Sequence, residues 1–168
     1  MKAVFQIKPF LSLLLGAFLL SACGADAVVS AVKSVVSMQP AKVWLEKANF
    51  VASDNVNDSS PITVHIVIPY KPELLADLSK MDADTYFQKV DQLKLDNVGQ
   101  IDVFSWDIIR GQHLNDVSIT PSKVTGEGVL VFARYSSPGP HRVAVADDRE
   151  ITMQLDKMDF KVIPVKHK

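Results

Sequence analysis

Residues 62–70, ITVHIVIPY, decide the fold because their apolar side chains alternate along the chain. One face of this segment carries Ile62, Val64, Ile66, Ile68 and Tyr70. Thr63, His65 and Val67 share the opposite face, where we expect a half-buried or exposed imidazole at His65. A period of two with β-branched side chains is the pattern of a strand that lies with one face on a core.

The same period recurs on both sides of this segment. It predicts seven further strands, at residues 42–52, 101–109, 117–120, 128–135, 141–146, 150–155 and 159–165. Turn-forming residues separate several of these strands, at residues 53–61, 136–140 and 147–150. Short strands joined mostly by tight turns are typical of an all-β protein, and we expect a two-sheet β-sandwich.

A helical period interrupts this pattern between the second and third predicted strands, in residues 71–95. Pro72 is suited to the first turn of a helix, where its missing N–H costs nothing. The apolar residues that follow at helical spacing are Leu74, Leu75, Leu78 and Met81. Asp82 or Asp84 is placed to cap a second helix. We therefore expect a short helical insertion in the sandwich.

The chain begins with the three-part layout of a secretory signal. Lys2 and Lys8 precede an apolar run at residues 10–20, FLSLLLGAFLL, and two small residues follow the run. This run is too short to cross a bilayer, which needs about 20 residues. We expect residues 1–22 to be a signal peptide, and the alternative is a core helix of the mature fold.

The single cysteine of the chain, Cys23, directly follows this signal. Residues 20–23, LSAC, resemble the bacterial lipobox, in which the signal is cut before the cysteine and the thiol is diacylated. Two or more acyl chains give a lasting membrane anchor. Gly24, in place of aspartate, favours the periplasmic face of the outer membrane by analogy. The alternative is a chance cysteine after an ordinary signal.

Removal of the signal leaves 146 residues, which is enough for one domain. We divide them into a lipidated tether at residues 23–40 and a β-sandwich domain at residues 41–168. Valines at helical spacing in the tether leave a short amphipathic helix open as an alternative. The mature chain has 16 basic and 19 acidic residues and no basic stripe, so we expect no nucleic-acid partner.

No motif in the sequence assembles catalytic or metal chemistry. The four histidines lack a second ligand at metal-binding spacing, and no G-x-S-x-G is present. We expect no catalytic residue, metal, cofactor or small-molecule substrate. Residues 54–59, DNVNDS, are rich in oxygen but lack the glycine and glutamate of an EF-hand. Asx turns account for them, and a loose cation site is the alternative.

Residues 43–70, VWLEKANFVASDNVNDSSPITVHIVIPY, resemble the start of the TssJ family, the outer-membrane lipoproteins of type VI secretion systems. The positions that match are Asn55, Asn57, Pro61, Val64 and Tyr70. A helical segment with a phenylalanine, here Phe87, and a late strand like VLVFARY are also similar. The resemblance covers most of residues 43–165.

The resemblance implies a transthyretin-like β-sandwich and a non-enzymatic adaptor that binds the periplasmic domain of TssM, an inner-membrane protein. In that family the loop between the first two strands is implicated in the contact. The partner-binding residues that we predict in this loop are Asp54, Asn55, Asn57, Asp58, Ser59 and Pro61. The alternatives are a pilotin-like or other envelope assembly lipoprotein, and a periplasmic hydrolase or ligand carrier, because catalytic groups assemble in space rather than in sequence.

Overall fold

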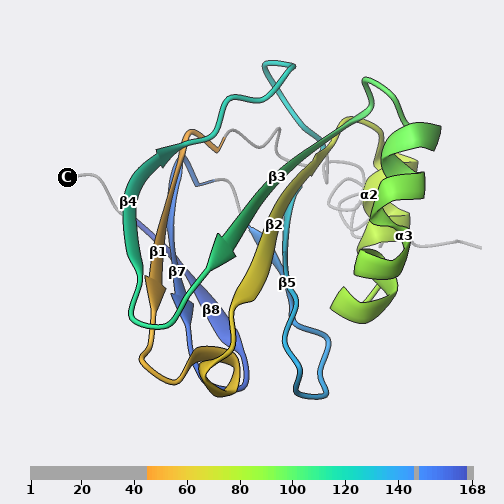
Figure 1. Cartoon of the computed structure of the whole chain (residues 1–168). Helices are drawn as coiled ribbons and strands as arrows, with labels where there is room; N and C mark the ends of the chain where they lie inside the picture. Colours follow the sequence, from red (N-terminus) through yellow and green to blue (C-terminus); the bar gives the residue numbers. More distant parts are fainter. Residues whose placement is uncertain (1–44, 146–147, 166–168) are drawn as a thin grey trace, which may run out of the picture. The chain divides into compact units, whose positions relative to one another are not determined.

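The computed structural model describes residues 45–145 and 148–165, and within them the chain forms two four-stranded sheets (Figure 1). The first sheet has the order β4-β1-β7-β8 and the second has the order β3-β2-β5-β6. The strands are β1 (Lys47–Ala52), β2 (Ile62–Pro69), β3 (Ile101–Ile108), β4 (His113–Ser118), β5 (Val129–Ala133), β6 (Arg142–Val145), β7 (Glu150–Leu155) and β8 (Phe160–Pro164). The prediction of a two-sheet sandwich is confirmed.

Strand β2 lies inside its sheet and pairs antiparallel with both β3 and β5. Its predicted alternation is confirmed, because Ile62, Val64 and Ile66 are fully buried in the core between the sheets. That core takes Phe50 from β1 and Ile151 from β7 on the opposite side. A strand with one face in such a core has a strongly specified register, since a shift by one residue would expose the apolar set.

Helices α2 (Pro72–Leu78) and α3 (Ala83–Asp96) follow β2 and cover the outer face of the second sheet (Figure 1). Beneath them lies a second apolar cluster, in which Val67 and Phe132 of the sheet meet Tyr86 of α3. The rings of Tyr86 and Phe132 stack with centroids 4.0 Å apart. Strand β5 is therefore buried on both faces.

Local chemistry accounts for where both helices begin. Pro72 occupies the first turn of α2, as predicted from its fixed backbone angle and absent N–H. At the start of α3 the side chain of Asp82 accepts a hydrogen bond from the backbone N–H of Thr85, over 2.8 Å. Of the two candidate caps, Asp82 is therefore the one that the helix uses.

His65 lies half-buried on the helix-covered face of β2. Its Nδ1 is 3.0 Å from the hydroxyl oxygen of Tyr86, and its ring packs 4.7 Å from that of Phe87. Burial lowers the pKa of His65 to about 4 and raises the pKa of Tyr86. The imidazole is therefore neutral at pH 7, and its Nδ1 shares a hydrogen bond with the phenol of Tyr86.

One strand departs from the prediction. The sequence predicts a strand at residues 117–120, whereas β4 spans His113–Ser118 and pairs with β1. The prediction therefore missed its first four residues, which include an asparagine and an aspartate, both poor strand formers. Asp116 has a φ of 54°, and the pairing with β1 shifts register between Ala48 and Phe50. This irregularity is a β-bulge on an edge strand, where the ladder tolerates it.

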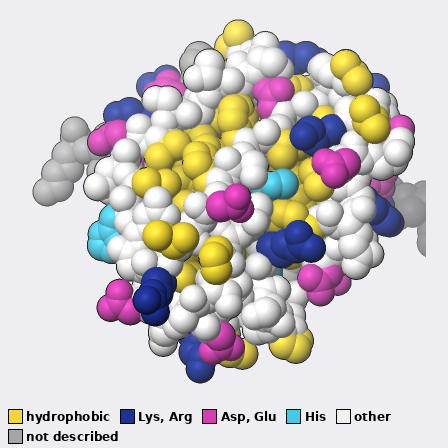
Figure 2. Space-filling view, viewed as in Figure 1, with side chains coloured by type: hydrophobic (Ala, Val, Ile, Leu, Met, Phe, Trp, Pro, Cys, Tyr) yellow, Lys and Arg dark blue, Asp and Glu magenta, His cyan; other side chains and the backbone are white. Residues whose placement is uncertain are grey.

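The edge strands β3 and β4 leave apolar side chains at the surface between them. Figure 2 shows a group of hydrophobic side chains on this face of the molecule. The half-buried members that pack against the core there are Phe104, Trp106, Leu114 and Val117. Among the residues described, no helix is long and apolar enough to cross a membrane.

Candidate functional site

Four turns gather at one end of the sandwich, which we call the loop end (Figure 1). The turns that form it are residues 53–61, 109–112, 134–141 and 156–159. Backbone hydrogen bonds hold the first of them to its neighbours. The N–H of Ser53 donates to the carbonyl of Leu155 over 2.9 Å, and the N–H of Gly111 donates to the carbonyl of Ser53 over 3.2 Å. The loop end is thus one connected surface.

The loop 53–61 contains a short 3₁₀ element, η1 (Val56–Ser59), with an unusual backbone. Asn57, Asp58 and Ser59 have φ angles of 45°, 52° and 67° in succession. Asparagine and aspartate tolerate this left-handed region better than other residues with a side chain. The turn chemistry predicted for this loop is therefore present, in a tight form that the residue types alone do not specify.

Asn57 holds this loop in place. Its side chain is only 6% exposed, and its Oδ1 accepts hydrogen bonds from the backbone N–H and the hydroxyl of Ser136, over 2.8 and 2.9 Å. Its Nδ2 donates to the carbonyl of Pro61 over 3.1 Å. The hydrogen-bonding groups that the sequence offered to a partner at Asn57 are thus engaged inside the domain.

The other predicted partner-binding residues lie at the surface. Asp54, Asn55, Asp58, Ser59 and Pro61 are exposed. Asn55 accepts a hydrogen bond from the hydroxyl of Ser53 over 3.0 Å, and Asp58 forms an ion pair of 3.1 Å with Lys157 of the turn between β7 and β8. The loop therefore presents polar groups from a fixed backbone, which is the arrangement in which binding residues usually lie.

The alternative of a cation site finds no support in the geometry. Within residues 45–145 and 148–165, no group of three or more histidine, cysteine, aspartate or glutamate side chains is placed to hold a metal ion. Calcium takes six to eight oxygen ligands. In this loop, the carboxylate of Asp58 is directed to Lys157 instead of toward the other acidic side chain.

Three side chains at the loop end have the composition of a hydrolase triad, which the sequence did not reveal. His141 is 4% exposed, and its Nδ1 lies 3.0 Å from Oδ1 of Asp159. Its Nε2 lies 3.5 Å from the hydroxyl of Ser137 but only 2.7 Å from the carbonyl oxygen of the same residue.

The hydrogen bonds of this group oppose a catalytic reading. The Ser137 hydroxyl donates to the carbonyl of Met158 over 2.7 Å, so its proton is directed away from the imidazole. Nε2 of His141 faces a carbonyl acceptor and must carry a proton itself, so it cannot act as the base for Ser137. The group joins the turn 134–141 to the turn 156–159. Tyr135 adds a further bond, from its hydroxyl to the carbonyl of Asp159 over 2.9 Å.

Sequence reasoning missed two apolar side chains on the loop end. Ile109 is 56% exposed and Met158 is 53% exposed. Met158 lies beside a shallow, mainly apolar hollow lined by residues 156–161. The sequence pattern around each residue could have indicated its exposure. Met158 stands among charged residues in a turn, and Ile109 breaks the alternation of apolar residues at the end of β3. Exposed aliphatic and methionine side chains next to polar groups are common in protein interfaces.

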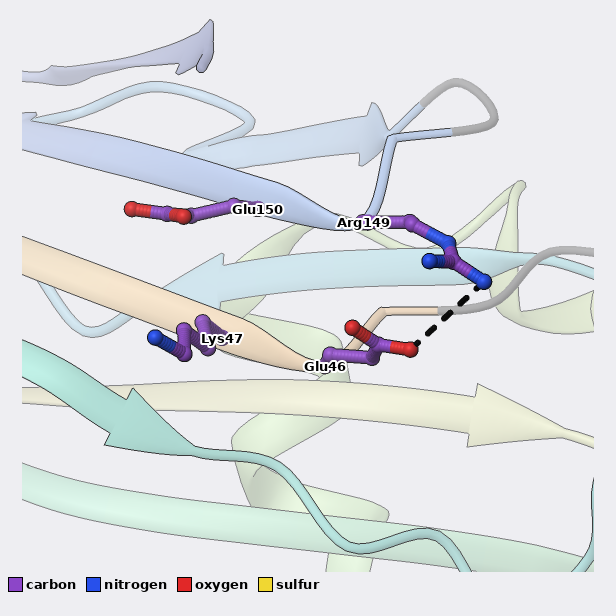
Figure 3. Close-up of a pocket in the computed structure, with 4 residues that line it drawn as sticks. All are labelled: Glu46, Lys47, Arg149 and Glu150. Atoms are coloured by element: carbon purple, nitrogen blue, oxygen red, sulfur yellow. Dashed lines mark ion pairs between the residues drawn. The ribbon is translucent and has the colours of Figure 1, made fainter. Parts of the chain in front are cut away.

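A second hollow lies at the opposite end of the sandwich and is charged (Figure 3). It is lined by Glu46, Lys47, Arg149 and Glu150. Arg149 and Glu46 approach to 3.8 Å across it, and Lys47 pairs with Asp116 over 2.8 Å. Charges of both signs at the rim offer no site for a single ionic ligand. The predicted signal at residues 1–22, Cys23 and the tether at residues 23–40 lie outside the described residues.

Comparisons with known proteins give matches in structure alone. No model of a known protein family matches the sequence, and no characterised protein sequence matches it. The structure of the type VI secretion lipoprotein TssJ1 from Pseudomonas aeruginosa matches with a TM-score of 0.57 and 12% identity. The match covers 76% of this chain and 100% of that one.

Two further structures agree. Serratia marcescens Lip, described as a membrane-bound component of the type VI secretion system, matches with a TM-score of 0.52 and 15% identity over 74% of this chain and 99% of that one. A chain in a structure of the TssM C-terminal domain from EAEC matches with a TM-score of 0.54 and 15% identity, over 71% and 98%. The resemblance found in residues 43–70 is thus confirmed at the level of the fold, and this chain has the fold of the TssJ lipoprotein structures.

Proposed function

We propose that this protein is an adaptor lipoprotein of a type VI secretion membrane complex. Acyl chains on Cys23 hold it at the periplasmic face of the outer membrane, and its sandwich domain binds the periplasmic domain of a TssM-like inner-membrane protein. The observation that carries the proposal is the shared fold, which extends over 98–100% of the three matching chains. Those chains come from structures of secretion components, and none is described as an enzyme.

We place the partner contact at the loop end. The exposed polar residues of loop 53–61 lie on a backbone fixed by Asn57, so little conformational entropy is lost when a partner binds. Ile109 and Met158 extend this surface with apolar area. The polar residues of the loop and these two apolar side chains together form a mixed surface, which is typical of protein–protein interfaces. A hydrolase is disfavoured, since the Ser137 hydroxyl is directed away from His141.

The test is calorimetry with the purified periplasmic domain of the TssM-like protein from the same organism. The double variant Asp54→Ala/Asn55→Ala should bind that domain at least about tenfold more weakly, a loss of about 1.4 kcal/mol. It leaves Asn57 intact, so the loop keeps its backbone. Circular dichroism should show an unchanged fold.

The matched control is Gln88→Ala/Asp91→Ala on the exposed face of α3, which removes one amide and one carboxylate as the loop variant does. It should bind with the affinity of the unmodified protein. Loss of binding in this control, with full affinity in the loop variant, would move the interface to the helices. No binding by the unmodified protein would reject the adaptor function.

A further inference from the structure

The end of the sandwich opposite the loop end is where the described chain enters the domain, and we call it the entry end. It comprises residues 45–46, 97–102 and 119–124. Strand β1 runs from here toward the loop end. The N–H of Ile119 donates to the carbonyl of Glu46 over 2.8 Å, and Nζ of Lys123 donates to Oε1 of Gln100 over 3.3 Å. These bonds join the three segments into one surface.

Three large aliphatic side chains are mostly exposed at this end and in the last turn of α3, which leads into it. Leu95 is 70% exposed, Val98 is 77% exposed and Val124 is 71% exposed. They are the most exposed of the six large hydrophobic side chains at the described surface. Figure 2 shows hydrophobic side chains standing singly along the upper edge of the molecule, over the end of α3 and the loop after β4. Single exposed apolar side chains are common on protein surfaces, but three at one end of the domain need an explanation.

The charges around these side chains do not favour one ionic partner. Lys94 and Lys123 are positive, Asp96 is negative, and Glu46 is paired with Arg149 over 3.8 Å. The carboxylate of Asp102 is occupied, since it accepts hydrogen bonds from Tyr70 and from Ser122, each over 2.5 Å to Oδ2. Lys94 directly precedes Leu95 in the chain, and Lys123 directly precedes Val124. Lysines next to aliphatic residues suit a lipid–water interface, where the ammonium group remains in the headgroup layer and the apolar atoms enter below it.

We propose that Leu95, Val98 and Val124 insert into the lipid–water interface of the membrane that holds the acylated protein. This inference rests on the proposed acylation of Cys23. Only 21 residues separate Cys23 from Leu45 at the entry end, so the domain is held within about 75 Å of the lipid. A tether of this length raises the effective concentration of the membrane next to the domain, and weak apolar contacts then become significant.

The orientation that follows agrees with the proposed adaptor role. With the entry end on the lipid, the loop end points away from the membrane, toward a partner that arrives from the inner side of the envelope. A second copy of the chain is the competing occupant of these aliphatic side chains. The charge balance also predicts that the contact with lipid depends on apolar burial and persists in high salt.

The experiment uses the acylated protein bound to vesicles of phosphatidylethanolamine and phosphatidylglycerol. Acylation removes the thiol of Cys23, so a new cysteine is the single position that a fluorophore can label. The variants are Val98→Cys at the entry end, Val124→Cys as an independent second position, and Met158→Cys at the loop end as the control. Lipids with a nitroxide on the headgroup quench a fluorophore that lies at their depth.

We expect several-fold stronger quenching at positions 98 and 124 than at position 158, both at low salt and in 0.5 M salt (about a 4 Å screening length). Equal quenching at all three positions in vesicle-bound protein would overturn the inference, as would quenching that high salt abolishes. Shielding from water without quenching by the nitroxide would instead assign this surface to a second copy. A protein that does not float with the vesicles would contradict the acylation itself, which is a different failure.

Discussion

Asn57 was predicted from the sequence to contact the partner, but in the structure its side chain holds the candidate loop in place. Its amide joins the loop 53–61 to the turn 134–141, and its φ of 45° is one that asparagine tolerates. We predict that Asn57→Ala lowers the free energy of unfolding by about 2–4 kcal/mol. The variant loses the three hydrogen bonds of the amide and places an alanine in the left-handed region.

The matched control for this prediction is Asn55→Ala, two residues earlier in the same loop. Asn55 is exposed, so its loss should change the free energy of unfolding by less than about 0.5 kcal/mol. Urea unfolding at pH 7 measures both variants. Equal costs at the two positions would mean that the amide of Asn57 does not hold the loop.

His65 predicts a pH dependence of stability. Its pKa is about 4 in the folded protein and about 6.5 when unfolded, so between these values the unfolded chain binds a proton that the folded chain does not. The contribution of the neutral imidazole to the free energy of unfolding is complete above pH 6.5 and is lost as the pH falls toward 4. The full shift corresponds to about 3 kcal/mol, which we reduce to about 1–2 kcal/mol because the ring is half-buried.

Urea unfolding between pH 7 and pH 4 tests this dependence. Carboxylates also titrate in this range, so the comparison is between the unmodified protein and His65→Gln, whose stability should fall less with acid. His113→Gln replaces an exposed histidine and should retain the full dependence. The assignment to His65 fails if the two variants respond to pH alike.

Among the elements, α3 depends most on one side chain. Tyr86 is fully buried, stacks on Phe132 and forms a hydrogen bond with His65. We predict that Tyr86→Ala lowers the free energy of unfolding by about 3–5 kcal/mol, as loss of a buried aromatic ring does. Tyr86→Phe keeps the ring and removes only the hydrogen bond with His65, at a cost of about 1 kcal/mol. Thermal unfolding followed by far-UV circular dichroism compares them, and equal losses would show that ring packing does not hold the helix.

The elements also show which parts of the fold can be predicted from the sequence. Alternating apolar residues predicted β2 and β7 because one face of each strand lies in the core. The prediction covered only the last two residues of β4, because an edge strand with a bulge buries little and its side chains show a weak pattern. The region of the candidate loop was predictable from its turn formers. The burial of Asn57 was not, because Ser136 lies 79 residues away in the chain.

For the whole molecule, the decisive prediction concerns Cys23. Metabolic labelling with a palmitate analogue should mark the unmodified protein, which should fractionate with the outer membrane. Cys23→Ser should carry no label and should appear in the soluble periplasmic fraction. Cys23 is the acylation site that we propose, and several acyl chains are needed for a lasting anchor. Label that persists in Cys23→Ser would show that another group is modified.

The parallel pairing of β1 with β7 imposes an order on folding. Strand β1 is the first strand of the domain, and Lys47 pairs with Glu150 near the far end of the sequence. During synthesis the chain emerges from its N-terminus, so β1 has one unpaired edge until β7 has been made. Closing a contact over about 100 residues is slow for entropic reasons. Truncation before residue 150 should therefore leave one edge of β1 unpaired, and an unpaired strand edge promotes aggregation, which light scattering of the truncated chain would detect.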